Sequence, residues 1–228
     1  MVAPELPETV ELPEPDNMVA AAASPHNAAV IVAHPDDETL WCGGFILTHP
    51  NYNWFIASMC RKDDSDRSAK FFRALQTFGA TGAMGELDDG PDQCPLLQDE
   101  IQQAMLEMIP AVPFDLILTH APRGEYTRHR RHEEVSRSVI QLWNAGALST
   151  QELWLFAYQD GEGRTFPRAI EAAHLHNLLP EKIWQEKYRL ITEIYGFDPH
   201  SWEAHTTPKV EAFWRFTSPS ALDEQIIG

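Results

Sequence analysis

The chain has 228 residues, of which 43% are hydrophobic, so it is long enough to bury a sizeable core in one large domain. Asp and Glu total 34 against 17 Lys and Arg, which gives a formal net charge of -17. Because phosphate binding requires a basic surface, this charge argues against nucleic acid or an anionic membrane surface as a general partner.

The cysteine content and the distribution of apolar residues indicate a cytoplasmic protein. The three cysteines, Cys42, Cys60 and Cys94, include no CxxC pair, and a sparse, odd count of this kind is typical of reduced thiols. No apolar run approaches the roughly 20 residues that span a bilayer, so stable membrane insertion is not expected. The N-terminus lacks the basic region with which a secretory signal begins.

Residues 1–27 have the composition of a disordered tail. The stretch contains five prolines and five acidic residues but no Lys or Arg. Such a segment buries too little apolar surface to offset the entropy that ordering costs. We therefore expect an acidic, proline-rich disordered tail over 1–27, followed by a single domain over 28–228.

From Ala28 onward, strands alternate with helices. In chain order, we expect strands over 28–34, 54–60, 83–87, 115–120 and 152–158, and helices over 38–48, 66–78, 96–109 and 132–143. Gly79 ends the second helix, since glycine suits the left-handed position after a helix. Helices of this length between strands indicate parallel βαβ units, and continuous apolar strands indicate a sheet that is covered on both faces. The predicted fold class is therefore α/β with a mostly parallel sheet.

The sequence pattern is less regular after Tyr158. A helix is expected over 181–195, whereas 196–216 is rich in aromatic residues and shows no clear period. We therefore expect an irregular C-terminal segment that either caps the sheet or forms part of a pocket wall.

Two of the expected strands end in clusters of ionisable side chains. The strand over 28–34 ends in HPDDE, residues 34–38, and the strand over 115–120 ends in the sequence THAPRGEYTRHRRHEE. In parallel sheets of this kind, ligands bind at the carboxyl ends of the strands. Both clusters therefore lie where a binding site is expected.

Together, the two strand ends can supply the ligands of one metal ion. His34 and Asp37 are three residues apart at the first end, and His129 and His132 are three residues apart at the second. If the two strands are neighbours, two histidines and a carboxylate converge, which is the ligand set of a catalytic zinc with one position open to water. A zinc so held lowers the pKa of its water towards ~7 and polarises a carbonyl group. A second carboxylate beside the metal, free to accept a proton, would complete a hydrolase.

Each cluster also has a simpler explanation. HPDDE can be a solvated turn whose carboxylates cap the following helix. The HxxH sequence can be the solvated start of a charged helix. The combination of both clusters, each at the carboxyl end of a strand, favours a metal site more than either cluster does alone. The remaining histidines are assigned to the surface or the core by default, although His120 lies on the same rim.

The sequence AHPDDE after an apolar strand, followed by GG and further on by GEY and HxxH, resembles the PIG-L/LmbE-like family of zinc-dependent de-N-acetylases. The resemblance extends from about Ala28 to Tyr158. It implies a Rossmann-like three-layer fold and hydrolysis of an N-acetyl group, usually on an amino sugar or a sugar conjugate. The expected partner is therefore a small N-acetylated sugar-like substrate, and the expected cofactor is Zn²⁺ or another divalent ion.

The resemblance also implies a role for each residue of the two clusters. His34 and Asp37 would bind the zinc, with His132 as the third ligand. Asp36 would be the general base that activates the water. His129, in its protonated form, would stabilise the developing oxyanion or protonate the leaving amine.

Three further residues are candidates for substrate binding. Tyr126 of GEY would donate to the oxyanion, although two further residues separate GEY from HxxH in this chain. Arg67 matches the start of an Arg-x-x-Glu helix of the family only in part, because Lys70 stands in place of the glutamate. Asp89 in LDDGP resembles an Asp-Gly loop that binds a sugar hydroxyl, but the same residues can form only a turn.

Five of the 17 basic residues lie within 15 positions around the proposed third ligand: Arg123, Arg128, Arg130, Arg131 and Arg137. Their simplest explanation is exposed ion pairs with Glu125, Glu133 and Glu134, which contribute only ~0–1 kcal/mol. Alternatively, some guanidinium groups line the pocket mouth and accept a phosphate or carboxylate of the substrate. The ion pairs are slightly favoured, because helix periodicity cannot direct all five arginines towards one site.

Two functions are open on this evidence. The favoured one is a zinc amidohydrolase, and the alternative is a non-catalytic Rossmann-like module that binds a metal or a ligand without turnover. No GxGxxG sequence follows the first strand, which argues against a dinucleotide site. A carboxylate left free beside the ligands favours the enzyme, because structural zinc sites are normally closed by four protein ligands.

Overall fold

The computed structural model describes residues 26–127 and 129–222. The tail expected over 1–27 therefore lies outside the described residues except for its last two. Strand β1 begins at Asn27, one residue before the expected start of the domain. Strands from both ends of the described chain, β1 and β9, join the same sheet.

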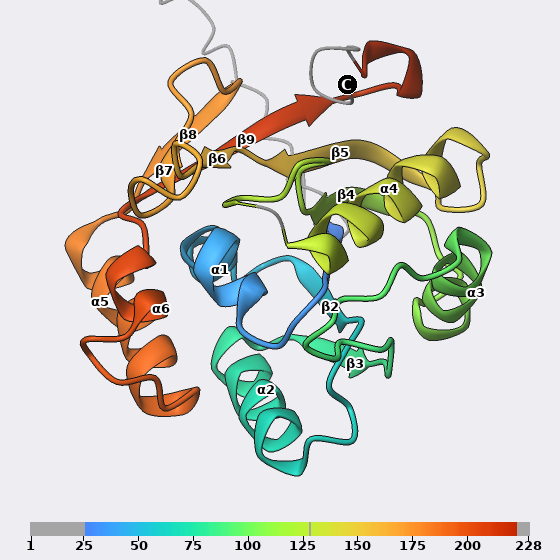
Figure 1. Cartoon of the computed structure of the whole chain (residues 1–228). Helices are drawn as coiled ribbons and strands as arrows, with labels where there is room; N and C mark the ends of the chain where they lie inside the picture. Colours follow the sequence, from blue (N-terminus) through green and yellow to red (C-terminus); the bar gives the residue numbers. More distant parts are fainter. Residues whose placement is uncertain (1–25, 128, 223–228) are drawn as a thin grey trace, which may run out of the picture.

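Seven strands form this sheet in the order β3-β2-β1-β4-β5-β9-β8 (Figure 1). The first five along the chain are mutually parallel: β1 (Asn27–Val32), β2 (Asn53–Ser58), β3 (Thr81–Met84), β4 (Phe114–Thr119) and β5 (Thr150–Phe156). Strand β9 (Val210–Phe216) runs antiparallel to β5, and β8 (Leu175–Leu178) runs antiparallel to β9. The prediction of a mostly parallel sheet is thus confirmed. Because β1 and β4 pair directly, their carboxyl ends lie side by side.

Helices cover both faces of the sheet, which confirms the three-layer arrangement (Figure 1). Helices α1 (Asp37–Thr48) and α2 (Ser65–Phe78) pack in one hydrophobic cluster, and α3 (Gln98–Met108) and α4 (Arg130–Asn144) pack in the other. Strand β1 supplies alternate residues to each cluster: Val30 to the first and Ile31 to the second. A strand buried on both faces reads as a continuous apolar run, which is why β1 was recognisable in the sequence.

The boundaries of the elements agree with the sequence in most places. Gly79 ends α2 in the left-handed conformation, with φ 66° and ψ 27°. The strand expected over 83–87 is β3, which lies a few residues earlier. The strand expected over 152–158 ends at Phe156, and the next residues form β6 (Tyr158–Gln159), which pairs with β7 (Arg168–Ala169) in a separate two-stranded sheet.

The expectation of an irregular C-terminal segment holds only in part: 196–201 and 207–209 are irregular, and Trp202 and Glu203 form part of a cavity wall, as one of the two expected arrangements had it. Residues 196–216 contain the short helix α6 (Trp202–Thr206) and strand β9, which joins the main sheet between β5 and β8. Strand β9 buries residues on both faces, so its sequence lacks the alternation by which a half-buried strand is recognised. The helix expected over 181–195 is present as α5 (Glu181–Arg189), which continues into a π-helical turn, η1 (Leu190–Ile194).

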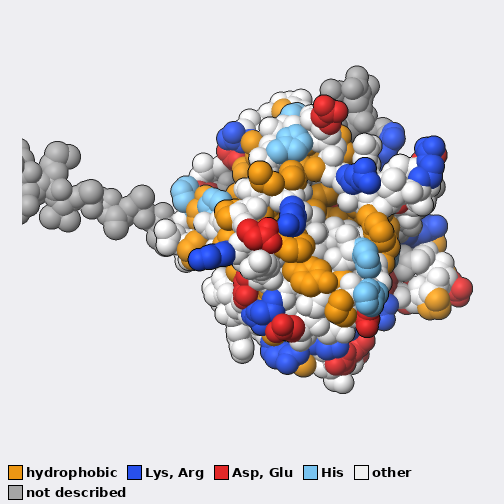
Figure 2. Space-filling view, turned by 90° about the vertical axis from the view of Figure 1, so that its left-hand side faces the viewer, with side chains coloured by type: hydrophobic (Ala, Val, Ile, Leu, Met, Phe, Trp, Pro, Cys, Tyr) orange, Lys and Arg blue, Asp and Glu red, His pale blue; other side chains and the backbone are white. Residues whose placement is uncertain are grey.

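The face that α5 and α6 present to solvent is mixed in character. Figure 2 shows apolar side chains at the centre of this face, with charged and histidine side chains around them. Leu178 and Trp202 are among the exposed large apolar residues of the described chain, which ends with the 3-10 turn η2 (Pro219–Ala221). Within residues 26–127 and 129–222, no helix is both long and apolar enough to cross a membrane.

Candidate metal centre

The HPDDE turn is buried rather than solvated. Asp36 and Asp37 are 8% and 4% exposed, and Asp36 precedes α1 without capping it through its side chain. The backbone of Asp36 has φ 121°, a strained value for a residue other than glycine. Two contacts hold this conformation: the Asp36 N–H donates to Glu38 Oε2 (3.1 Å), and Tyr195 donates its hydroxyl to Glu38 Oε1 (2.7 Å). The interpretation of HPDDE as a solvated capping turn is therefore wrong.

Three donor atoms converge on one point: two come from the turn after β1 and one from the first turn of α4. His34 Nδ1 lies 3.1 Å from Asp37 Oδ2 and 3.2 Å from His132 Nε2, and His132 Nε2 lies 3.3 Å from Asp37 Oδ2. Ligands at the usual 2.0–2.1 Å from a tetrahedral zinc are separated by about 3.3–3.4 Å. The three atoms therefore fit three corners of one tetrahedral site, and the neutral nitrogen and anionic oxygen donors suit a divalent ion.

A buried carboxylate that we did not assign from the sequence orients the histidines. Glu125 Oε2 accepts from Nδ1 of His132 (2.7 Å) and from Nδ1 of His120 (2.9 Å), and Glu125 is fully buried. Burial opposes its ionisation, but the two histidines hold the pKa of Glu125 at about 2. Since Nδ1 of His132 bonds to Glu125, its Nε2 is the nitrogen that faces the donor cluster, and it would present a lone pair there once it has lost its proton. Glu125 is thus not one of the exposed ion pairs expected among the arginines, and only its place in GEY pointed to it.

His120 also belongs to the cluster, contrary to its default assignment. Its Nε2 lies 3.5 Å from Asp37 Oδ2. The same nitrogen accepts a hydrogen bond from the backbone N–H of Ala33 (2.9 Å), and its Nδ1 is bonded to Glu125. Because its lone pair already has a partner, His120 is better placed to support the cluster than to act as a fourth ligand.

Asp36 and Asp37 lie in different electrostatic environments. Burial raises the pKa of Asp37, but the charges of His132 and His120 outweigh this and hold it well below its usual range. Burial and the neighbouring Asp37 carboxylate raise the pKa of Asp36 well above its usual range, against the opposing effect of Arg67. Adjacent carboxylates with opposite shifts are typical of sites that divide metal binding from proton transfer.

His129 lies against the donor atoms in its neutral form. Its ring stacks on the His132 ring with centroids 4.5 Å apart and meets the His34 ring edge-on at the same distance. Burial, followed by the charges of His132 and His34, lowers the pKa of His129 to about 3. In this structure the neutral form of His129 is therefore favoured over the protonated form.

The three candidate substrate residues line one cavity of about 390 Å³ beside the donors, but two of them already have protein partners. Arg67 lies 3.3 Å from Asp36 Oδ2. Asp89 Oδ1 lies 3.2 Å from His34 Nε2, poorly aligned for a hydrogen bond, and its Oδ2 accepts from Arg61 at 2.6 Å and 2.9 Å. Asp89 therefore contacts the donor cluster and is not merely part of a solvated turn. Tyr126 is half-buried and forms part of the wall.

The arginine cluster separates into different environments. Arg131 is fully buried, pairs with Glu134 and donates to the backbone carbonyls of Asp88 and Cys94, so it is neither an exposed ion pair nor part of the pocket mouth. Arg130 and Arg137 line another cavity, and Arg123 lines a third. Arg128 lies outside the described residues. Arg61 and Arg67 are the arginines of the metal-centre cavity.

Comparison with known proteins gives matches only to solved structures. No family model matches the sequence, and no curated protein matches it significantly. The N,N'-diacetylchitobiose deacetylase from Pyrococcus horikoshii superposes with a TM-score of 0.65 at 13% identity, over 84% of this chain and 84% of that one. A 4-carboxy-2-hydroxymuconate hydratase from Pseudomonas putida gives a TM-score of 0.60 at 13% identity, over 83% and 95%.

A third match is a deacetylase of the teicoplanin biosynthesis pathway, with a TM-score of 0.60 at 13% identity, over 83% of this chain and 97% of that one. A zinc-inhibited form of a teicoplanin deacetylase also matches. At these identities the similarity shows the fold alone, and the neighbours include both deacetylases and a hydratase. The chain therefore has the fold of the PIG-L/LmbE-like proteins that its AHPDDE motif resembles.

Proposed function

We propose that the protein is a metal-dependent hydrolase that removes an N-acetyl group from an amino sugar or a sugar conjugate. His34, Asp37 and His132 would hold one divalent ion, for which Zn²⁺ suits the mixed nitrogen and oxygen donors. When bound, the ion would supply Lewis-acid polarisation of the acetyl carbonyl and would acidify a water molecule. The remaining steps depend on the side chains around it.

Asp36 is the proposed general base. Its carboxylate lies beside the donor cluster but outside the set of three mutually close donor atoms, and Arg67 is its polar partner at 3.3 Å. Burial raises its pKa, so that once ionised it is a stronger base than an exposed aspartate. In this role it takes a proton from the attacking water and can later return it to the leaving nitrogen.

His129 and Tyr126 are the proposed partners of the oxyanion. The neutral imidazole of His129 can donate its N–H to the oxygen of the tetrahedral intermediate, and it does not require the protonated form that the sequence analysis assumed. Tyr126 shares the cavity wall with His129 and packs on its ring with centroids 6.0 Å apart. Asp89 borders the same cavity and is the proposed acceptor for a sugar hydroxyl.

The observation that carries this proposal is the pair of adjacent buried aspartates. One lies within the donor cluster and the other lies outside it, and their pKa values shift in opposite directions. A module that only binds a metal has no use for a second buried carboxylate, because its burial is unfavourable. This difference favours the enzyme over the non-catalytic alternative.

The fold does not distinguish amide hydrolysis from hydration of a double bond, because a hydratase shares it. The test is therefore acetate release. The protein, loaded with Zn²⁺, is incubated with a panel of N-acetylated sugars and conjugates, and free acetate and free amine are both measured. Stoichiometric release of the two products, lost in Asp36→Asn protein that retains its metal, supports the proposal. No acetate from any member of the panel, with the metal bound, contradicts it.

A further inference from the structure

Three cavities that share wall residues follow one another from the metal centre to α4, and we call this row of cavities the groove. The metal-centre cavity shares Arg61, Asp89 and His129 with a second cavity of about 510 Å³. The second cavity shares Gln93 with a third, of about 400 Å³. Because adjacent cavities have common walls, a ligand that reaches the donor atoms can extend through them to the surface of α4.

Three buried polar atoms along this groove lack a hydrogen-bond partner within the described part of the chain. They are Nε2 of His34, Nδ1 of His129 and Oε1 of Gln93. The Gln93 amide is fixed from its other side, since its Nε2 donates to Asp89 Oδ1 (2.7 Å). Buried polar atoms are nearly always hydrogen-bonded, so unpaired ones that line a groove indicate that a polar ligand or water occupies it.

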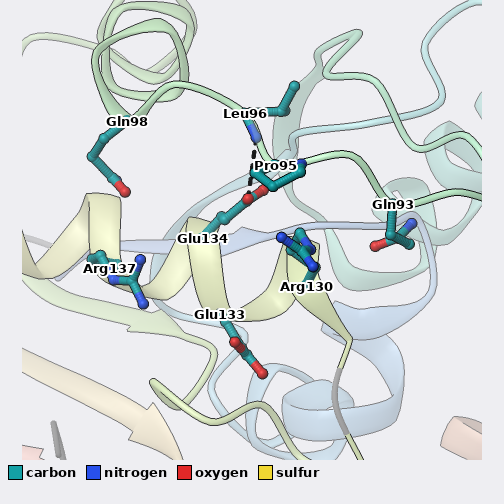
Figure 3. Close-up of a pocket in the computed structure, with 8 residues that line it drawn as sticks. All are labelled: Gln93, Pro95, Leu96, Gln98, Arg130, Glu133, Glu134 and Arg137. Carbon is teal, nitrogen blue, oxygen red and sulfur yellow. Dashed lines mark hydrogen bonds between the residues drawn. The ribbon is translucent and has the colours of Figure 1, made fainter.

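The third cavity presents two guanidinium groups (Figure 3). Arg130 and Arg137 are seven residues apart on α4, which places them on the same face of the helix about 10 Å apart along its axis. Both side chains are exposed, and neither makes an ion pair or a side-chain hydrogen bond with any of residues 26–127 or 129–222. Two unpaired arginines in one cavity are unexpected in a chain of net charge -17.

The acidic residues of this cavity do not neutralise the two arginines. Glu134 is already satisfied, because it accepts from the Leu96 N–H (3.2 Å) and pairs with the buried Arg131. Figure 3 shows Glu133 pointing to the opposite side of α4 from Glu134. Glu133 also lines the cavity, so one carboxylate stands against the two guanidinium groups, and the local charge is positive.

The arginines nearer the metal centre are already engaged. Arg61 forms two hydrogen bonds to Asp89, and Arg67 pairs with Asp36. A negatively charged group on a ligand would have to displace a protein carboxylate there. At Arg130 and Arg137 it would displace only water.

We propose that Arg130 and Arg137 form an anion-binding site at the far end of the groove, and that the substrate carries a carboxylate or a phosphate away from its N-acetyl group. The planar guanidinium forms paired hydrogen bonds with either anion. The site itself follows from the groove and its charges, whereas the position of the acetyl group at the metal centre rests on the proposed function.

The test measures binding by calorimetry, with three disaccharide probes long enough to extend along the groove: N,N'-diacetylchitobiose, its 1-phosphate and its C1 aldonic acid. The neutral sugar is the reference, and the other two carry a phosphate and a carboxylate. We expect the anionic probes to bind about ten- to a hundredfold more tightly than the neutral one, as for hydrogen bonds between charged groups. In the Arg130→Ala/Arg137→Ala protein this ratio should fall to about one, and 0.5 M salt should reduce it in the unmodified protein.

Arg168→Ala is the matched control, because Arg168 is exposed, lies on β7 and lines none of the three cavities. It should retain the preference for the anionic probes. Equal affinity for neutral and anionic probes overturns the proposal, and so does a preference that survives in the double variant but disappears in Arg61→Ala. Because binding needs no turnover, an arginine-dependent preference without acetate release would leave the anion site standing and would contradict only the proposed hydrolysis.

Discussion

The residues that carry the chemistry and many of those that hold them in place come from different parts of the chain. The donor atoms and the free carboxylate lie in two short segments: 34–37, just after β1, and 129–132, at the start of α4. Three supporting side chains come from beyond β5: Tyr195 and Glu211 contact α1, and Asp160 contacts the loop before α4. A short motif can thus specify the chemistry while its geometry depends on residues without a motif.

Glu211 illustrates how the supporting side chains act. It is fully buried on β9, and its two oxygens accept from the backbone N–H groups of Gly44 (2.7 Å) and Phe45 (2.6 Å) in the middle of α1. Lys187 of α5 lies 2.7 Å from the same carboxylate and is also fully buried. The C-terminal part of the chain therefore holds α1, whose first residues carry Asp37, through a buried ion pair.

Changes to the donor residues and to the free carboxylate should remove function and leave the fold intact. His132→Ala and Asp37→Asn should each lose the metal almost completely, a larger effect than the ~10–100-fold typical of residues that only orient a ligand. The measurement is metal content after dialysis, together with the thermal unfolding midpoint. Stoichiometric zinc at unchanged affinity in His132→Ala would show that the third ligand lies elsewhere.

The Asp36→Asn variant tests proton transfer separately from metal binding. We expect the variant to retain the metal and to lose ~10²–10⁴-fold in kcat, the usual contribution of a general base. Metal content and acetate release are measured on the same preparation. Loss of the metal in Asp36→Asn, with retention in Asp37→Asn, would exchange the roles of the two residues.

Sequence reasoning succeeded where the determining interactions are local. Strand β1 is a continuous apolar run, and the spacing of His34 and Asp37 places both at its end. It failed where a residue's state depends on a distant partner: Glu125, set among arginines, is buried only because two histidines bind it, and β9 is a strand only because β5 pairs with it. The pairing of β9 leaves no period in the sequence, and Glu125 is marked only by its place in GEY.

Changes to the supporting side chains from beyond β5 should instead lower the stability of the fold. Glu211→Gln leaves the buried Lys187 ammonium without a counter-charge, and breaking a buried pair in this way costs about 3–5 kcal/mol. The free energy of unfolding is measured by urea denaturation. The control is Glu181→Gln, which breaks the exposed pair with Lys209 (3.0 Å) and should cost no more than about 1 kcal/mol. Equal losses in the two variants would contradict a special role for the buried pair.

Tyr195 is a supporting residue that acts directly on the site. Its hydroxyl donates to Glu38, which in turn accepts from the backbone N–H of Asp36 and fixes its strained conformation. Tyr195→Phe removes one hydroxyl, and we expect kcat to fall about five- to tenfold, in line with one hydrogen bond, at unchanged KM and metal content. Tyr158→Phe is the control, since that hydroxyl also bonds α1 but does so at the carbonyl of Trp41, away from Asp36. Equal changes of kcat in both variants would show that Tyr195 only stabilises the fold and does not position Asp36.

The smallest effect is expected at Asp160, which anchors the loop that precedes α4. Its carboxylate accepts from the backbone N–H (2.5 Å) and the hydroxyl (2.6 Å) of Thr127. Burial alone would raise the pKa of Asp160, but these hydrogen bonds lower it below the ~3.9 of an unfolded aspartate. A carboxyl group whose pKa is lower in the folded state stabilises the fold above that unfolded value, and this contribution is lost as the pH falls towards the folded value. Asp160→Asn should therefore lower the unfolding midpoint at pH 7, and the difference from the unmodified protein should narrow below about pH 4. A difference that stays constant from pH 7 to pH 3 would mean that ionised Asp160 does not hold the loop.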